Sequence, residues 1–236
     1  MLVDAGISAR RITSGLADVG LSPRELDGIL ITHEHTDHIS GLANLLKKAP
    51  VPVYAPETVA MALRLLIPQA GCIRPVAQGE DLILGGLGVI PFPTCHDTPE
   101  SVGYRLSSDD GCAVAIATDT GCVTETMLNY MSGTDIALIE ANHDVAMLRN
   151  GPYPPALKRR ILSDRGHLSN AECLWLAAVL ASRGTKRIVL GHLSRQNNLP
   201  ALARRTVSRG LEGTDVRLDV APELGCLQVE VAPCFT

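Results

Sequence analysis

The sequence lacks the features that mark membrane, secreted and strongly basic proteins. No apolar run approaches the roughly 18 residues that a membrane-spanning helix needs. The first residues, MLVDAGISARR, lack the basic-then-apolar order of a secretory signal. A formal net charge of −4 gives no general basic footprint for nucleic acid. We therefore expect a cytoplasmic protein, without a membrane partner, that holds any polyanionic substrate through metal ions or a small basic patch.

Cysteine is present, but not in the spacing of a cysteine-ligated metal or redox site. The seven cysteines are scattered, and none forms a C-x-x-C pair. We expect reduced thiols that serve mostly as small core residues. They occupy positions 72, 95, 112, 122, 173, 226 and 234.

Short apolar runs bounded by turn residues alternate with helical patterns along the whole chain, which predicts a single α+β domain over residues 1–236. Ser22 and Ser169 are each followed by a glutamate three residues later, and this capping-box pattern predicts two helix starts. The predicted strands are 28–32, 51–54, 113–118, 136–140 and 187–190, and the helical patterns cover 12–19, 42–46, 61–66 and 174–180.

The segment ITHEHTDHISGL contains His33, His35, Asp37 and His38 within six residues, although the chain has only seven histidines. A random chain of this composition would contain the pattern with a probability of roughly 4 in 10,000, so chance explains it poorly. On a loop between a strand and a helix, these side chains can converge on neighbouring cations. The alternative is a polar helix cap that contains histidines by chance.

Three further residues follow apolar, strand-like runs and extend this ligand set. His96 could complete three imidazoles around a first metal, and Asp119 could bridge two metals. His192 could complete a second metal with Asp37 and His38. The alternatives are an ordinary Asx turn at Asp119 and a capping or structural histidine at position 192.

With these residues in this order, the chain resembles the metallo-beta-lactamase superfamily, and LVDAG resembles the first motif, whose acid, here Asp4, supports the metal loop. The segments EANHD, GPYPPALKRRI, GHLSN and GHLSRQNN resemble the YycJ/WalJ-type branch. The resemblance implies a four-layer αββα sandwich with two divalent metal ions. Imidazole and carboxylate ligands suit zinc, manganese or iron. Because family members have strands ahead of LVDAG, we expect the first strands to be missing.

The resemblance also suggests an acid–base pair. Glu140 and His167 are similar to the glutamate and histidine that tRNA-maturing RNase Z enzymes carry between the bridging aspartate and the last metal ligand. With Asp37 and Asp119, they form the predicted catalytic set. The alternative has Glu140 as a strand-end acid and His167 as a helix-entry residue. His143 fits a surface helix better than a metal site.

A phosphodiester is the predicted substrate, because its leaving oxygen needs a proton and its anionic oxygens suit two metals. Ser194 and Arg195 could hold a phosphate, and the basic run 158–160 could contact a nucleic-acid backbone, although a solvated helix face explains that run equally well. The YycJ/WalJ-type branch implies a DNA exonuclease that acts from the 5′ end. The alternatives are a thioesterase or lactonase of the same fold and a regulatory protein with little turnover.

Overall fold

The computed structural model describes residues 1–68 and 71–231, and its chain divides into two compact units. Unit 1 comprises residues 1–91 and 98–102, and unit 2 comprises 92–97 and the chain from 103 onward. Each unit has a hydrophobic core of its own. The prediction of a single domain remains a prediction.

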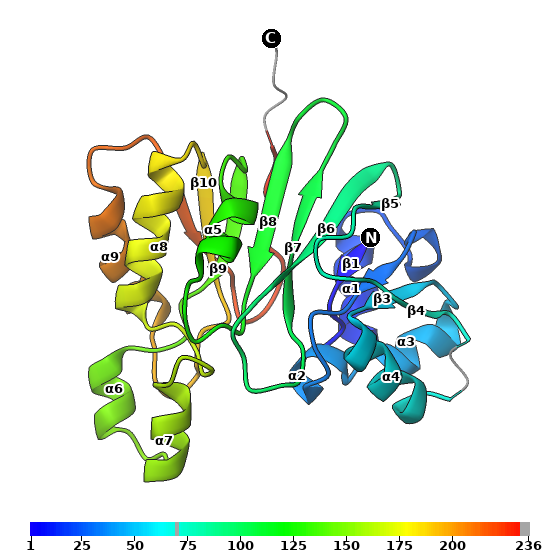
Figure 1. The fold of residues 1–236 in the computed structure, drawn as a ribbon, viewed down its shortest axis with the longest axis horizontal. Coiled ribbons are helices and arrows are strands. Elements are labelled where there is room, and N and C mark those ends of the chain that lie inside the picture. Colours follow the sequence, from blue (N-terminus) through cyan, green and yellow to red (C-terminus); the bar gives the residue numbers. More distant parts are fainter. Residues whose placement is uncertain (69–70, 232–236) are drawn as a thin grey trace. The chain divides into compact units, whose positions relative to one another are not determined.

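Unit 1 contains a parallel four-stranded sheet in the order β1-β2-β3-β4 and an antiparallel hairpin of β5 and β6 (Figure 1). Its strands are β1 (Leu2–Val3), β2 (Ile29–Leu30), β3 (Val53–Ala55), β4 (Ile73–Pro75), β5 (Leu82–Leu84) and β6 (Leu87–Pro93), the last of which runs into unit 2. Its helices are α1 (Ala9–Asp18), η1 (Pro23–Glu25), α2 (Thr36–Ile39), α3 (Leu42–Lys48) and α4 (Glu57–Leu66).

The apolar pattern of the sequence explains this sheet. Every residue of β2 and β3 is buried, as expected for central parallel strands whose two faces are both covered. Leu42, Leu45 and Leu46 lie at helical spacing on α3 and join the same core. The predicted strands and helices of this region are confirmed, with shorter strands than predicted.

Unit 2 contains strands in the order β11-β10-β9-β8-β7. Strands β8, β9, β10 and β11 are parallel to one another, and β7 is antiparallel to β8. These strands are β7 (Val102–Ser107), β8 (Ala113–Ala117), β9 (Ile136–Glu140), β10 (Arg187–Gly191) and β11 (Arg217–Val220). The helices are α5 (Glu125–Met131), α6 (Val145–Asn150), α7 (Pro155–Ile161), α8 (Asn170–Ser182), α9 (Pro200–Ser208) and η2 (Arg209–Leu211).

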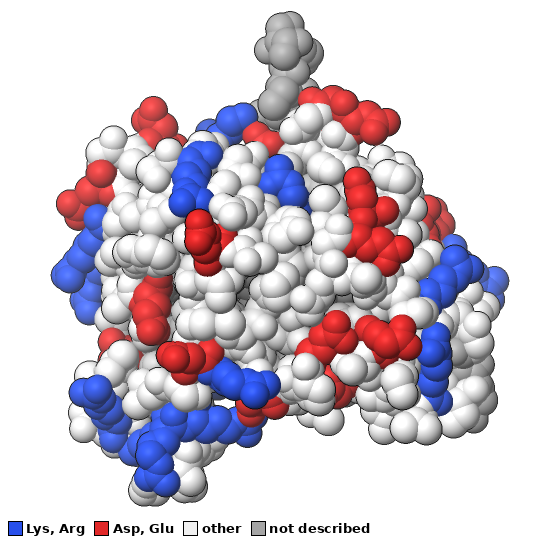
Figure 2. Space-filling model, in the orientation of Figure 1, with Lys and Arg blue, Asp and Glu red and all other residues white. Residues whose placement is uncertain are grey.

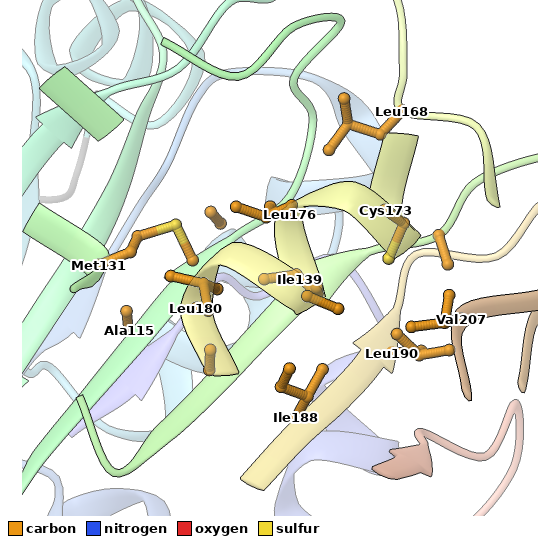
Figure 3. Close-up of a cluster of buried hydrophobic side chains, with 14 of the residues drawn as sticks. Ala115, Met131, Ile139, Leu168, Cys173, Leu176, Leu180, Ile188, Leu190 and Val207 are labelled. Carbon is orange, nitrogen blue, oxygen red and sulfur yellow. The ribbon is translucent and has the colours of Figure 1, made fainter. Parts of the chain in front are cut away.

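Helix α8 fixes the core of unit 2. It packs beside α9 and against β9 and places Cys173, Leu176 and Leu180, which are completely buried, toward the sheet residues Ile139 and Ile188 (Figure 3). Its start is the predicted capping box, with the Ser169 hydroxyl near the Glu172 amide and the Glu172 carboxylate accepting from the Ser169 amide at 2.7 Å. The start of α8 is therefore set locally by sequence.

The capping box predicted at Ser22 is present, but it begins only the short 3₁₀ helix η1, because Leu26 is already extended and the chain enters β2 three residues later. One expectation needs correction. The cysteines are not mostly core residues: only Cys173 is buried, Cys226 is exposed, and Cys234 lies outside the described residues. The other four are partly buried because they lie in loops and at strand margins: Cys72, Cys95, Cys112 and Cys122. Over the described ranges, no helix has the length and apolarity needed to cross a membrane.

Candidate functional site

Unit 1 gathers the histidines of the H-x-H-x-D-H segment between the end of β2 and the first turn of α2. His33 and His38 are buried, His35 is half-buried and Asp37 is exposed. The ring centroid of His33 lies 4.6 Å from that of His35 and 4.1 Å from that of His38. The structure therefore brings the three predicted imidazoles into one cluster.

Asp4, in the loop after β1, organises this cluster. Its Oδ1 accepts from the Thr32 amide at 2.8 Å, and its Oδ2 accepts from the Thr32 hydroxyl at 2.9 Å. The same Oδ2 lies 2.7 Å from Nδ1 of His38. The Thr32 oxygen in turn lies 3.0 Å from Nδ1 of His33. Asp4 thus holds two of the predicted ligands, one directly and one through Thr32, a residue that the sequence analysis did not single out.

Gly6 lets this support approach the histidine loop. A Cβ at Gly6 would lie 1.4 Å from the carbonyl oxygen of Asp37, so no larger residue fits there without moving backbone. The amide of Ala5 donates to the carbonyl of His38 at 2.7 Å. The DAG segment after β1 is therefore built against the loop that carries the histidines.

In unit 2 the predicted residues lie at the carboxyl ends of three adjacent parallel strands. Asp119 follows β8, Glu140 ends β9, and His192 follows β10. Because parallel strands end at the same edge of a sheet, these side chains meet although they are far apart in sequence. His167 joins them from the loop before α8, and possible ligand atoms of all four residues lie within 4.8 Å of one another.

Glu140 is the centre of this group. It is completely buried, and its Oε1 lies 2.7 Å from Nδ1 of His167 and 2.8 Å from Nδ1 of His192. Its Oε2 accepts from the amides of Thr120 at 3.1 Å and Leu168 at 3.3 Å. The sequence analysis predicted the contact with His167 but not the shared contact with His192.

These hydrogen bonds shift the ionisation of the group. Burial would raise the pKa of Glu140, but the hydrogen bonds from His167 and His192 outweigh it and hold that pKa below its ordinary value. Burial would lower the pKa of His167, but the hydrogen bond and charge of Glu140 outweigh it and raise that pKa. Glu140 is therefore a carboxylate, and His167 accepts a proton more readily than an ordinary histidine.

His96 joins the same group from the loop after β6. Its Nδ1 lies 3.1 Å from the carbonyl oxygen of Gly166, and its Nε2 lies 3.8 Å from Oδ1 of Asp119. A Cβ at Gly166 would lie 2.2 Å from the carbonyl oxygen of Ile161, so this close passage of the loop past the end of α7 requires glycine. Burial lowers the pKa of His96 and favours its neutral form.

Backbone strain is concentrated at the site residues. Among the described residues other than glycine, only Asp4, Asp119 and His192 have positive φ, between 54° and 58°. This left-handed conformation costs about 1–3 kcal/mol for a side chain that does not favour it, and it persists only where surrounding contacts enforce it. Each of the three follows a strand, and its side chain lies beside a histidine or an acid of the candidate site in its own unit.

The protonation pattern fits metal binding through Nε2. Nδ1 of His38, His96, His167 and His192 faces a carboxylate or a carbonyl oxygen, which can only accept. In a neutral ring Nδ1 then carries the hydrogen, and Nε2 keeps its lone pair. Such carboxylate or carbonyl partners are the usual support of histidine ligands. With the carboxylates nearby, these donors suit zinc, manganese or iron.

Ser194 and Arg195 have structural contacts of their own. Nε of Arg195 lies 3.0 Å from Oε1 of Glu223, and both side chains are exposed. The Ser194 hydroxyl accepts from the amide of Asn197 at 3.2 Å. Their predicted contact with phosphate remains a prediction.

The expectation that His143 lies on a surface helix is wrong. His143 precedes α6, is 1% exposed, and forms an isolated bridge with Ser169. The bridge and the hydrogen bond from the Asn170 amide to its carbonyl oxygen draw it into the interior. Sequence reasoning also missed Asn142, whose side-chain amide donates to the carbonyl oxygen of His192 at 3.1 Å. The motif EANHD contained both residues and was the available signal.

Comparisons with known proteins agree with this geometry. Residues 1–193 match the family model described as the beta-lactamase superfamily domain. The chain is 40% identical over 224 residues to exodeoxyribonuclease WalJ of Streptococcus pneumoniae, covering 93% of this chain and 83% of that protein. It is 39% identical over 214 residues to exodeoxyribonuclease YycJ of Bacillus anthracis, covering 90% of this chain and 81% of the relative.

Solved structures share the fold at low sequence identity. Zn²⁺-bound PqqB from Methylobacterium extorquens is 20% identical with a TM-score of 0.71, covering 97% of this chain and 82% of that one. The metallo-beta-lactamase fold protein YhfI from Bacillus subtilis is 17% identical with a TM-score of 0.70, covering 93% of this chain and 83% of that one. These structures confirm the predicted α+β fold class, and the family model and the two relatives confirm the predicted family.

Proposed function

The chain belongs to the metallo-beta-lactamase superfamily and, within it, to the family of the exodeoxyribonucleases WalJ and YycJ, and we propose that it is a metal-dependent exonuclease that removes nucleotides from the 5′ end of DNA. The observation that carries the proposal is the shared contact of buried Glu140 with His167 and His192, beside Asp119. The cytoplasmic location predicted from the sequence is part of the same proposal.

Two divalent ions, either zinc, manganese or iron, are part of the proposal. The residues proposed to hold them are His33, His35, Asp37, His38, His96, Asp119 and His192. The pair of ions would lower the pKa of a bound water toward neutrality and stabilise the charge that develops on the phosphate. The Nδ1 contacts within each unit support the proposed ligands, because they leave Nε2 as the donor nitrogen.

The residues of unit 2 supply the acid for the leaving group. Glu140 accepts from Nδ1 of His167 and keeps Nε2 as the nitrogen that exchanges a proton with substrate. The hydrogen bond and the charge of Glu140 favour the protonated ring at the start of the reaction. When the phosphodiester bond breaks, His167 would donate this proton to the departing 3′ oxygen. The now neutral ring would be protonated again from water.

This acid distinguishes a phosphodiester from a thioester substrate. A departing alkoxide is a strong base and needs a proton, whereas a thiolate leaves without one. A histidine oriented by a fully buried carboxylate would add little to thioester hydrolysis. The names of the relatives, which are exodeoxyribonucleases, support the same choice.

The direct test is hydrolysis of 5′-labelled double-stranded DNA with zinc or manganese added. Wild-type protein should release labelled 5′ nucleotides only when metal is present, and Asp119→Ala, prepared identically, should release none. Asp215→Ala changes an exposed aspartate and should behave as wild type. Folded, metal-loaded wild-type protein that cleaves no DNA end would contradict the proposal and favour a small-molecule substrate.

A further inference from the structure

Basic side chains gather on α6, α7 and the loop that follows α7. The segment 149–165 contains five basic residues and one acid, Asp164, although the whole chain has a net charge of −4. Figure 2 shows basic side chains gathered at the lower left, where Figure 1 places α6 and α7. We call this surface the α6–α7 patch; its residues are Arg149, Lys158, Arg159, Arg160 and Arg165.

The two helices of the patch are joined to each other. Nζ of Lys158 donates to the carbonyl oxygen of Arg149 at 2.7 Å, which connects the last turn of α7 to the last turn of α6. Arg149 and Arg159 are exposed, and neither has an ion pair with an acid within the described part of the chain. These side chains thus extend from a fixed base into solvent.

Three other basic residues of unit 2, in contrast to Arg149 and Arg159, form ion pairs with acids. Lys186 lies 2.7 Å from Asp135, Arg187 lies 2.7 Å from Asp219, and Arg195 lies 3.0 Å from Glu223. Basic residues stabilise the last turn of a helix by only a few tenths of a kcal/mol up to about 1 kcal/mol. Helices α1, α5 and α8 form without any basic residue in their last turn. Helix stability therefore does not account for this concentration of charge.

The patch is connected to the candidate site within unit 2. Arg160 forms an ion pair with Asp97, and Oδ1 of Asp97 lies 3.2 Å from Nε2 of His96. Nε of Arg165 donates to the carbonyl oxygen of His96 at 2.9 Å. The chain then reaches His167 two residues later. Arg160 and Arg165 of the patch therefore contact the loop that carries His96, whereas Arg149 and Arg159 are exposed to solvent.

We propose that the α6–α7 patch binds the phosphate backbone of the DNA substrate a few nucleotides away from the cleaved bond. The inference rests on the proposed exonuclease function, and it adds where the substrate is held. A chain with a net negative charge needs a local cation-rich surface to hold a polyanion beside its active site. Arginine donates two hydrogen bonds to one phosphate, and Arg149 and Arg159 are available for this.

The test compares two double variants with the same loss of charge. Arg149→Gln/Arg159→Gln removes the two outer arginines of the patch. Arg204→Gln/Arg205→Gln removes two exposed arginines of α9 and serves as the control. Both variants should unfold at the same temperature as wild type. Binding to a labelled duplex with phosphorothioate linkages is measured by fluorescence anisotropy over a range of salt concentrations.

We expect the patch variant to bind about tenfold more weakly than wild type near 0.1 M salt. Its plot of log affinity against log salt should be shallower by about 1–2, since each lost phosphate contact contributes about 0.7–0.9. On cleavable DNA, its KM should rise while kcat at saturating DNA changes little. The control variant should match wild type in each measurement.

The outcomes separate the two proposals. The proposed role of the α6–α7 patch is wrong if the patch variant binds DNA with the affinity and salt dependence of the control. It is also wrong if wild type itself does not bind. If wild type cleaves DNA in that case, the proposed function stands without it. If wild type binds with the expected salt dependence, the patch variant does not, and nothing is cleaved, the patch stands and the exonuclease function is overturned.

Discussion

Oε1 of Glu140 lies 2.8 Å from Nδ1 of His192, a residue 52 positions later in the chain. The same oxygen is 2.7 Å from Nδ1 of His167. One completely buried carboxylate therefore orients a predicted metal ligand and the predicted acid together. Loss of its charge should affect both metal binding and turnover.

Glu140→Gln tests this shared role. A glutamine has no charge, and if its oxygen faces both imidazoles, its NH₂ group replaces the oxygen that accepts from the amides of Thr120 and Leu168, so donors face donors. We expect metal affinity or activity to fall by about 10- to 100-fold, the usual effect of removing a partner of a ligating histidine. Metal content after dialysis and the rate of DNA cleavage measure the two effects. Glu125→Gln, at an exposed position on α5, should change neither.

Two alanine substitutions should distinguish loss of the general acid from loss of a metal ligand: His167→Ala and His35→Ala. His167→Ala should keep its metal and lose turnover by about 10²- to 10⁴-fold, the range of general acid catalysis. His35→Ala should lose metal and activity together. Metal analysis and single-turnover cleavage distinguish the two patterns. Full activity in His167→Ala would remove this histidine from the mechanism.

His143 should differ from other buried polar residues in its effect on stability. Within the described residues, neither of its ring nitrogens has a hydrogen-bond partner, and burial lowers its pKa and keeps it neutral. An apolar residue removes this cost, so His143→Leu should leave the free energy of unfolding unchanged or raise it. Urea denaturation measures this free energy.

Asn198→Leu provides the comparison for His143. Asn198 is 3% exposed, and its side chain donates to the carbonyl oxygen of Ala141 at 2.8 Å and exchanges hydrogen bonds with Asn170. Its replacement should lower the free energy of unfolding by about 1–3 kcal/mol, because buried partners are left unsatisfied. An equal loss in His143→Leu would mean that the His143 ring is hydrogen-bonded in solution.

Asp135 should make stability depend on pH. Burial would raise its pKa, but hydrogen bonds from Lys186 and the Ala113 amide outweigh it and hold the pKa below its ordinary value. Its contribution is therefore fully present above the pKa of an unfolded aspartate and is lost as pH falls through the lower pKa of the folded state. Asp135→Asn should be less stable than wild type at pH 7, and the difference should shrink in acid.

Thermal unfolding across the range from pH 7 to pH 3 measures this difference. Asp215→Asn, at an exposed site, should follow wild type throughout. A difference between wild type and Asp135→Asn that stays constant down to pH 3 would exclude the ion pair with Lys186 as its cause.

Much of the fold follows from local sequence. The residues of β9 were predicted with the observed bounds, because a run of apolar residues between turn residues defines a buried strand. The start of α8 was predicted because its capping box uses only residues of the same turn. The sequence indicated β6 only as the apolar run before His96. It missed β4 and β5, which have three residues each, and β7 and β11, whose apolar residues are interrupted by glycine or charged residues.

The sequence by itself determined the donor types of the candidate site. Spacing of two residues places His33 and His35 on one loop, and any fold that forms this loop keeps them together. The resemblance implied the pair of Glu140 and His167, but only the tertiary structure decided that Glu140 also supports His192 and that Asp4 contacts His38. Glu140 meets His192 because β9 and β10 pair in a register that ends them at the same edge, and no local pattern encodes that register. Burial of His143 was decided in the same way, by a bridge to Ser169 across 26 positions.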